Sequence, residues 1–215
     1  VSKSRIMNDS AFARTRENIS EFGNNAKAAK LLRDAMGALV KNAKDSRTSN
    51  RLMQLFNKVK NLDTVSPRGQ RKISIALEDP VAKNFLQKFD FNKRAQLSNV
   101  LRRTFDLDPS AGTFAINAFV PAQDLLKPEG ATHATVIYAA MGLDFDTAES
   151  DLVQALPVNF ALDNVPQELS LSLDLPDTLP SVFQLLLIEF FQEVNTVQYP
   201  LNNGTFNVLN ILNVS

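Results

Sequence analysis

His133 is the only histidine in the chain, and the chain contains no cysteine. A Ser-His-Asp arrangement for acyl transfer would therefore have to use His133, and a cysteine nucleophile is excluded. The Gly-x-Ser-x-Gly turn that presents such a serine in many hydrolases does not occur in the sequence. His133 lies in the alternating stretch 132–136, which is typical of a strand, so we expect an ordinary strand position. The sequence thus favours a protein that is not an enzyme.

The seven glycines are scattered singly along the chain. They form neither a Gly-x-x-x-x-Gly-Lys loop nor a Gly-x-Gly-x-x-Gly turn, so nucleotide-dependent chemistry lacks the backbone that usually cradles phosphate groups. One histidine and no cysteine also argue against a structural zinc site, whose ligands are usually nitrogen and sulfur. We expect no cofactor.

The strongest metal candidate is the acidic run at residues 144–151, which contains Asp144, Asp146, Glu149 and Asp151. Alternating carboxylates in a loop offer the hard oxygen ligands that calcium prefers. The run lacks the central glycine and the terminal glutamate of an EF-hand loop. A solvated connection between strands is therefore the favoured interpretation, and a calcium site is the alternative.

Charge is distributed very unevenly along a chain whose formal net charge is zero. Residues 1–103 contain 22 of the 23 Lys and Arg and 9 of the 23 Asp and Glu, so their formal charge is +13, and residues 104–215 carry −13. Such an asymmetry indicates that the protein binds charged partners, and it does not indicate a catalysed reaction. A segment of this charge can bind polyanions such as nucleic acid through counterion release. The alternative is that a basic surface of one copy meets an acidic surface of another.

Arginines are the preferred basic candidates for such an assembly contact, because a guanidinium can pair with a carboxylate through two hydrogen bonds. These candidates are Arg14, Arg16, Arg33, Arg47, Arg51, Arg68 and Arg71. The acidic candidates are the four carboxylates of the run at 144–151 named above.

The basic candidates lie in a part of the chain whose apolar residues predict helices. Apolar residues recur with helical spacing over residues 28–43, which predicts the clearest helix of the chain. A shorter helix is expected before it, ending at Gly23, and a third helix is expected over residues 52–62. Asp79-Pro80 offers a capping side chain followed by proline, which predicts the start of another short helix. We expect a basic helical module over residues 1–96.

From about residue 97 the apolar period changes from helical to alternating. The expected strands lie between clusters of Pro, Asp, Asn and Gly, over residues 97–107, 113–119, 132–143, 152–162, 168–175, 182–194 and 206–214. Their number and spacing resemble immunoglobulin-like modules, although the cysteine pair and tryptophan of true immunoglobulin domains are missing. The last two strands are expected to form a hairpin near Asn203-Gly204.

We therefore expect an acidic β-sandwich module over residues 97–215. The predicted fold class is α+β, with an N-terminal helical module followed by an antiparallel immunoglobulin-like β-sandwich.

Three stretches carry a family resemblance. They are the segment from Arg-Ile-Met-Asn-Asp to Glu-Phe-Gly at residues 5–23, Phe-Asp-Phe-Asn at 89–92, and the segment from Ile-Glu-Phe-Phe to Asn-Gly at 188–204. Through them the chain resembles an uncharacterised family of bacterial proteins with a basic N-terminal part and a β-rich C-terminal part. The resemblance implies this two-part organisation and further glycine-containing residues upstream of Val1. It implies no activity, cofactor or catalytic residue.

The leading hypothesis is a non-enzymatic structural protein whose copies assemble head to tail into a homopolymer, such as an extracellular or cell-surface filament. The second is a sequence-independent nucleic-acid-binding protein that uses the basic helical module, and an enzyme acting through carboxylates is third. The longest aliphatic run, residues 185–188, is far shorter than the roughly 20 residues that cross a membrane, so we expect no membrane span. An extracellular or cell-surface location is favoured and a cytoplasmic one is the alternative, because a cysteine-free chain suits either.

Overall fold

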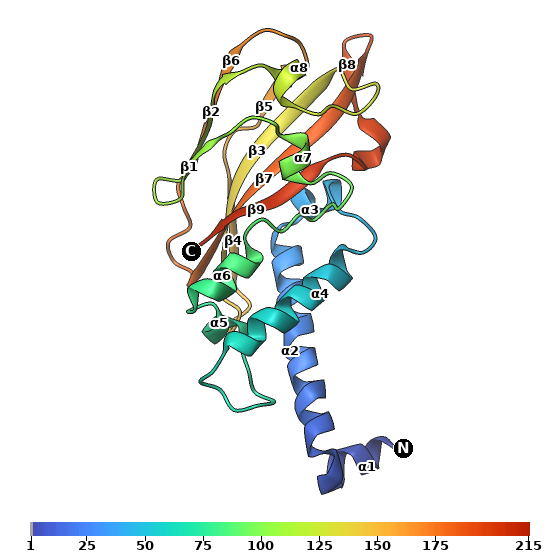
Figure 1. The fold of residues 1–215 in the computed structure, drawn as a ribbon, viewed down its shortest axis with the longest axis vertical. Helices are drawn as coiled ribbons and strands as arrows, with labels where there is room; N and C mark the ends of the chain where they lie inside the picture. Colours follow the sequence, from blue (N-terminus) through green and yellow to red (C-terminus); the bar gives the residue numbers. More distant parts are fainter. Residues whose placement is uncertain (1) are drawn as a thin grey trace.

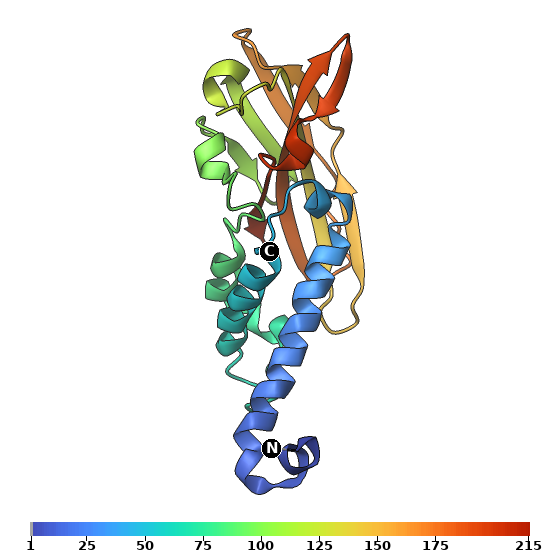
Figure 2. The same cartoon turned by 90° about the vertical axis from the view of Figure 1, so that its right-hand side faces the viewer.

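The computed structural model describes residues 2–215, with Asn202 described by its backbone alone. The molecule is elongated, with the helices gathered toward one end and the strands toward the other (Figure 1). The first helices project beyond the rest of the chain, as the view turned by 90° in Figure 2 also shows. Among the described residues, no helix is both long enough and apolar enough to cross a bilayer.

One long helix and several short ones precede the strands. In chain order these elements are α1 (Lys3–Asn8), η1 (Ser10–Phe12), α2 (Ala13–Ala35), α3 (Ala38–Asn42), α4 (Thr48–Val59), η2 (Lys60–Leu62), α5 (Ile73–Ala76), α6 (Pro80–Leu86) and α7 (Leu97–Val100). The helix predicted over 52–62 is confirmed as α4 with η2. The helix predicted after Asp79-Pro80 is confirmed as α6, and the Asp79 carboxylate caps it by accepting the Val81 amide N–H at 2.8 Å.

The predicted helix end at Gly23 is wrong. Gly23 lies inside α2, where a Cβ would meet no atom within 4 Å and the helical backbone continues on both sides. The break comes instead at Gly37, whose φ of +53° separates α2 from α3. A left-handed backbone of this kind favours glycine, and nothing at Gly23 requires it. Helical periodicity over 28–43 therefore spans two helices that share one buried face.

Two antiparallel sheets follow the helices. The strands are β1 (Asp106–Asp108), β2 (Thr113–Phe119), β3 (His133–Leu143), β4 (Ser150–Gln154), β5 (Val158–Ala161), β6 (Gln167–Ser172), β7 (Ser181–Val194), β8 (Val197–Pro200) and β9 (Val208–Val214), with α8 (Pro121–Asp124) and η3 (Leu201–Gly204) between them. The small sheet has the order β1-β2-β6. In the large sheet β3 pairs with β4, β5 and β7, and β7 pairs also with β8 and β9.

Two of the predicted strands differ from the observed ones. Residues 97–107 form α7 and a loop into β1, because the Asp90 carboxylate accepts the Leu97 amide N–H at 2.9 Å and starts a helical turn there. Residues 152–162 are divided between β4 and β5, since Pro157 provides no N–H for the sheet.

The hairpin after β7 turns earlier than predicted. Asn195 and Thr196, with φ of +51° and +66°, form the turn between β7 and β8. Both residues thus take the left-handed backbone of a tight two-residue hairpin. Asn203-Gly204 instead ends η3, which redirects the chain so that β9 pairs with the first half of β7.

β7 is buried on both faces. Leu185 and Leu187 belong to a core formed with the helices, whereas Leu186 and Ile188 belong to a second core formed with the small sheet. Alternate residues of a strand point to opposite faces, so one aliphatic run supplies both cores. The uninterrupted run at 185–188 is therefore the pattern of a central strand covered on both sides.

Polar groups join the helical part to the edge of β9. The backbone N–H groups of Lys88 and Phe91 donate to the carbonyls of Ile211 at 2.7 Å and Leu209 at 2.8 Å, so residues 88–91 extend the large sheet. The Asn92 side chain donates to the carbonyls of Thr205 and Asn207, both at 2.8 Å. The helical part is thus attached to the sheet by a shared apolar core and by the backbone hydrogen bonds between residues 88–91 and β9.

The predicted α+β class, with helices before antiparallel strands, is confirmed. The immunoglobulin-like sandwich is not confirmed: the small sheet covers one face of a curled larger sheet, and the helices pack on the other face. The predicted boundary between residues 96 and 97 falls at the start of α7. It stays a prediction.

Shared burial predicts that helices and sheet unfold together. Leu186→Ala and Leu187→Ala remove side chains that are 0% and 1% exposed. Each should lower the free energy of unfolding by about 3 kcal/mol, because each leaves a cavity in a close-packed core. Urea denaturation followed by circular dichroism should show one transition in both variants. The exposed Val194→Ala is the control, with a change below about 0.5 kcal/mol; a separate helical transition in Leu187→Ala would contradict a shared core.

Glu189 is a carboxylate placed at the junction of sheet and helices. It lies on β7, on the face that packs against the helical part, and accepts a hydrogen bond from the Asn42 side-chain amide at 2.8 Å. Burial raises the pKa of Glu189 above its ordinary value of 4.5, and the bond from Asn42 offsets part of this increase. The charged form is therefore disfavoured in the folded protein.

Glu189→Gln should raise the melting temperature at neutral pH. A raised folded pKa means that stability is fully present below the ordinary pKa and falls as pH rises through the folded value, so removal of the charge helps at neutral pH. The gain should vanish below pH 4.5, where Glu189 is protonated in both states. Thermal melts across this range provide the measurement. Glu193→Gln, at the far end of the same strand, is the matched control, and an equal gain there would show a general charge effect.

Candidate functional site

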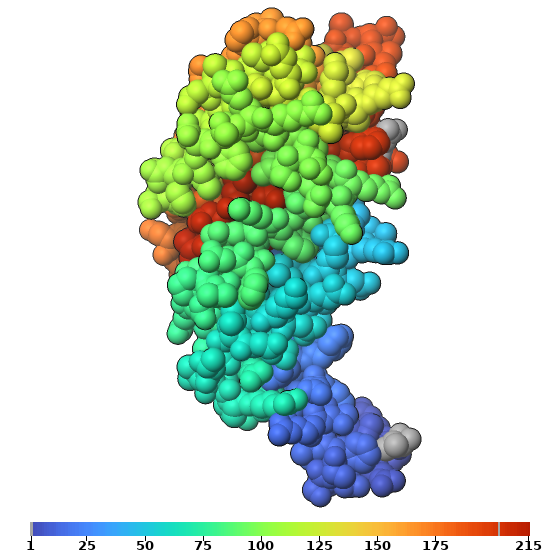
Figure 3. Space-filling view, viewed as in Figure 1, coloured from blue at the N-terminus to red at the C-terminus, as the bar shows by residue number. Residues whose placement is uncertain are grey.

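Residues 2–24 form a projecting arm, made of α1, η1 and the first half of α2 (Figures 1 and 2). The space-filling view shows the arm standing clear of the body at one end of the molecule (Figure 3). Large apolar side chains on it are uncovered: Met7, Ile19 and Phe22 are 56%, 56% and 59% exposed. Apolar side chains gathered on a projecting element are typical of a contact surface.

Glu21 is the one fully buried residue of the described arm. Its carboxylate pairs with the Lys60 ammonium and accepts the Gly69 amide N–H at 2.8 Å. Burial raises the pKa of this carboxyl, but Lys60, the Gly69 amide and Arg71 together outweigh it, so the pKa lies below its ordinary value. The charged Glu21 therefore holds the loop at 63–72 against α2.

Asp63 shapes the same loop from its other end. Its carboxylate accepts the amide N–H groups of Val65 at 3.0 Å, Ser66 at 2.8 Å and Lys72 at 2.9 Å. Burial raises the pKa of Asp63, and these donors more than compensate, so the pKa is lowered. These hydrogen bonds order the loop 63–72 beside the arm.

The predicted arginines of this region have different surroundings. Arg14 and Arg68 both contact the Glu17 carboxylate, at 3.4 and 3.2 Å, on the exposed face of α2. Arg16 donates to the carbonyls that end α1 and start η1, both at 2.8 Å, so it holds the tip of the arm together. Arg71 donates to Asn61 at 3.1 Å. Their role in assembly stays a prediction.

The opposite end of the molecule is acidic. We define the β end as residues 121–132, 162–168 and 192–200, which meet where β3 and β5 pair and β7 turns into β8 (Figure 1). These residues include five Asp and Glu and one Lys, a formal charge of −4. Exposed apolar side chains lie among them: Leu126, Val165, Val194, Val197 and Tyr199. Sequence patterning missed this surface because its three segments are far apart along the chain.

The acidic run at 144–151 docks on the helices of its own chain. Phe145 packs between Phe56 and Phe183, with ring centroids 6.1 and 6.2 Å away, and Asp146 pairs with Lys72 at 3.0 Å. The Asp144 carboxylate accepts two amides of the turn, at Asp146 and Thr147, which lowers its pKa.

The carboxylates of the run do not form a ligand cluster in the described structure. Among the described residues, no three His, Asp or Glu side chains come together as a metal ligand set. Glu149 and Asp151 are exposed. The run connects β3 to β4, and the calcium alternative stays a prediction. Assembly through these four carboxylates stays a prediction.

His133 occupies the first position of β3, opposite Ala161 and Phe191 in the neighbouring strands. Its Nε2 lies 3.6 Å from a Glu193 carboxylate oxygen, and its Nδ1 lies 3.0 Å from the Thr132 hydroxyl. The strand position predicted from the sequence is thus observed.

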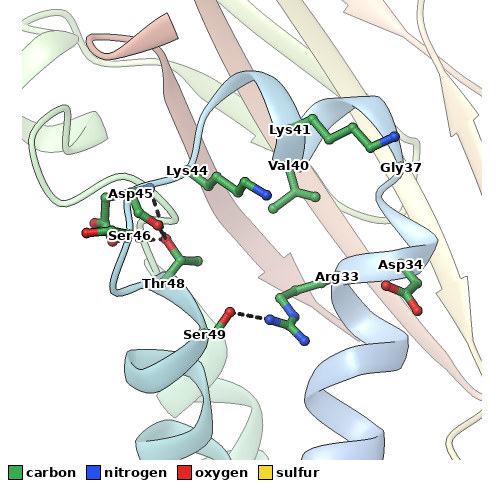
Figure 4. Close-up of a pocket in the computed structure, with 10 residues that line it drawn as sticks. All are labelled: Arg33, Asp34, Gly37, Val40, Lys41, Lys44, Asp45, Ser46, Thr48 and Ser49. Carbon is green, nitrogen blue, oxygen red and sulfur yellow. Dashed lines mark hydrogen bonds between the residues drawn. The ribbon is translucent and has the colours of Figure 1, made fainter. Parts of the chain in front are cut away.

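The helix-rich part also contains a hollowed basic surface. One hollow of about 590 Å³ lies between α2, α3 and the start of α4 and is drawn in Figure 4. A second hollow, of about 560 Å³, lies between the α3–α4 loop, residues 92–94 and η3. Both are lined by Lys44, Asp45 and Ser46, so they adjoin. We call the two hollows together the basic cleft.

Two predicted arginines line the basic cleft and a third stands behind it. Arg33 reaches from α2 to the Ser49 hydroxyl on α4, as Figure 4 shows, and Arg47 lines the second hollow. Arg51 is mostly buried, donates to the carbonyls of Asp90 and Phe91, and pairs with Asp45 at 2.8 Å. The cleft lysines and Arg94 were not predicted as candidates, because their common location depends on the contact between the α3–α4 loop and residues 92–94, where the Lys93 amide N–H donates to Asp45.

No family model, no curated protein and no solved structure matches this chain. The resemblance to a bacterial family stays a prediction, and the chain's own geometry carries the functional argument.

Glu21→Ala should loosen the loop at 63–72. The change leaves Lys60 buried without its partner, which should cost about 3 kcal/mol. Limited trypsin digestion should then cut faster after Arg68 and Arg71, as followed by mass spectrometry. Because the folded pKa of Glu21 is lowered, its stabilisation exists above the ordinary value of 4.5 and is lost as pH falls through the folded pKa. The difference in melting temperature should therefore shrink in acid.

Glu17→Ala is the control for this experiment. Glu17 lies one helical turn before Glu21, but its side chain is 31% exposed and its ion pairs are at the surface. Surface pairs contribute little, so this variant should lose less than about 1 kcal/mol. Because Glu17 pairs with Arg68, the comparison uses cleavage after Arg71. Equal cleavage after Arg71 in both variants would show that Glu21 does not hold the loop.

Proposed function

We propose that this protein is a non-enzymatic structural protein whose copies associate head to tail, with the arm of one copy on the β end of the next. The observation that carries the proposal is the projecting arm with uncovered Met7, Ile19 and Phe22. These side chains lie outside both cores of their own chain. A helix of 23 residues such as α2 is about 34 Å long, so its first half can reach a neighbour without disturbing the body.

Apolar burial supplies the favourable free energy of this contact. Full burial of a side chain the size of isoleucine or phenylalanine contributes about 1.5–3 kcal/mol. The β end offers matching apolar side chains, among them Val165 and Tyr199 at 63% and 54% exposure. A stable contact needs roughly 1,000 Å² of buried surface, so residues around Ile19 and Phe22, including Met7 on α1, must contribute to it as well.

Electrostatics favour this pairing of ends. The arm and the loop 63–72 contain seven Lys and Arg against four Asp and Glu, a formal charge of +3, facing the −4 of the β end. Charges of opposite sign steer association and select its orientation more than they add affinity. At physiological salt the Debye length is about 8 Å, so salt should slow association without abolishing an apolar contact.

When one copy binds another through two different surfaces, the growing assembly still has one free arm and one free β end after each copy is added. Such a heterologous interface produces a filament, or a ring if the rotation between copies closes. The arm and the β end lie at opposite ends of the elongated molecule (Figure 1), which favours linear growth.

Ile19→Ser with Phe22→Ser should prevent this association. Loss of two apolar contacts should weaken the interface by about 3 kcal/mol, roughly a hundredfold in Kd. Light scattering of nuclease-treated protein over a concentration and salt series, with electron microscopy, provides the measurement. Val81→Ser with Phe85→Ser is the matched control, since these residues are 48% and 44% exposed on α6, away from both ends.

A mixing experiment tests the head-to-tail arrangement itself. The arm variant keeps an intact β end, and a Val197→Ser, Tyr199→Ser variant keeps an intact arm. Each alone should stay monomeric, whereas an equal mixture should form dimers that cannot grow. A monomeric wild-type protein at high concentration, or a mixture that stays monomeric, would contradict the proposal.

Sequence-independent nucleic-acid binding is the second candidate. The observation that favours it is the basic cleft, whose lysines and arginines line two adjoining hollows. A protein that is monomeric after nuclease treatment and changes its size when DNA or RNA is added would favour this candidate over self-association.

A further inference from the structure

The basic cleft has cationic groups that its own chain does not neutralise. Within the described residues, Lys41, Lys44, Arg47, Lys93 and Arg94 line it, are exposed, and make no ion pair. By contrast, other basic residues of the helical part, such as Lys60 and Lys72, are paired with carboxylates. Like charges gathered around a hollow repel one another, so an anion that enters relieves this repulsion.

The two carboxylates in the described lining, Asp34 and Asp45, already have hydrogen-bond or ion-pair partners within the chain. Asp45 Oδ1 accepts the Arg47 amide N–H at 2.7 Å, and its Oδ2 accepts from Arg51 and from the Lys93 amide N–H, both at 2.8 Å. Asp34 pairs with Lys30 at 2.8 Å. Six basic and two acidic residues line the cleft, so the lining has a formal charge of +4.

The frame that carries these groups is rigidly attached. The Thr48 hydroxyl donates to the Phe91 carbonyl at 2.5 Å, which ties the α3–α4 loop to the segment that extends the sheet. The Arg51 guanidinium stacks over Phe89 at 5.1 Å, and Asn92 is bound to the carbonyls after η3. The two loops that carry Arg47 and Lys93 therefore keep a fixed separation, which lowers the entropic cost of binding.

We propose that the basic cleft binds a ligand carrying two or more phosphate groups. Two adjoining hollows with free cations on each side match at least two separate anionic groups, and Lys44 lies between them. No aromatic side chain is among the described residues that line the cleft, so these residues offer no surface on which a base could stack. Recognition is therefore of the phosphate groups themselves, from a nucleic-acid backbone or from a free polyphosphate, without base specificity.

Calorimetric titration with two probes, inorganic tripolyphosphate and single-stranded oligothymidylate, tests the site and its source. The cleft variant combines Lys44→Gln, Arg47→Gln, Lys93→Gln and Arg94→Gln. Whichever probe binds the wild type should bind this variant at least about tenfold more weakly. Binding should also weaken steeply with salt, because each neutralised phosphate releases counterions. Binding of tripolyphosphate supports free polyphosphate as a source, and binding of the oligonucleotide alone supports the nucleic-acid backbone.

The matched control combines Lys27→Gln, Lys58→Gln, Lys88→Gln and Arg102→Gln, which are exposed, make no ion pair within the described residues and lie outside the cleft and the β end. It removes the same net charge and should bind like the wild type. Equal weakening in both variants, or no binding of either probe to the wild type, would overturn the proposal. The monomeric arm variant should bind the probes unchanged, so failure of self-association and failure of this site are separate results. Melting temperatures of both variants without probe confirm their folding.

Discussion

Burial of β7 on both faces is the constraint on which the rest of the structure depends. A strand with aliphatic side chains at successive positions cannot leave either face in water, because each face exposes several large apolar groups. The small sheet covers one face and the helices cover the other. The helical part therefore completes the core of the sheet, although it differs from the sheet in composition and charge. The position of the basic cleft follows, since its second hollow forms where the α3–α4 loop and the segment 92–94 meet the chain returning to β9.

The opposite charges of the two halves of the chain contribute little to holding them together. Among the described ion pairs, one, Lys72 with Asp146, joins residues 1–103 to residues 104–215. The interface between helices and sheet consists of apolar side chains, backbone hydrogen bonds and uncharged amides such as Asn42, Asn92 and Asn207. This is the physically expected choice, because desolvation of an ion pair can cost more than its attraction returns. The segregated charges consequently remain on the surface, available to other molecules.

The arm and the basic cleft are two such charged surfaces, and they differ in composition. The arm combines exposed apolar side chains with a modest positive charge, which suits an apolar and acidic protein surface. The cleft combines basic side chains that make no ion pair among the described residues with polar side chains such as Ser46 and Asn92, which suits the binding of phosphate groups. Buried carboxylates organise both regions: Glu21 and Asp63 fix the loop beside the arm, and Asp45 fixes the loops of the cleft. Backbone amides donate to all three carboxylates, and Glu21 and Asp45 also pair with Lys60 and Arg51, so each carboxylate is held charged and shapes the backbone around it.

Local patterns alone determined much of this protein. The helical period located α4, the Asp-Pro signal located α6, alternation located β2, and apolar runs between turn residues located β3 and the central β7, because these signals depend on neighbours within a few residues. Tertiary structure decided the rest. Gly23 and Gly37 are the same residue type, and the helix ends at the one where the backbone must turn to bring α3 over the sheet. Residues 97–107 alternate like a strand, yet the Asp90 carboxylate and the end of the pairing with β9 produce a helical turn. The cleft and the β end each gather residues from distant segments, and a sequence pattern cannot show proximity that only the packing of β7 creates.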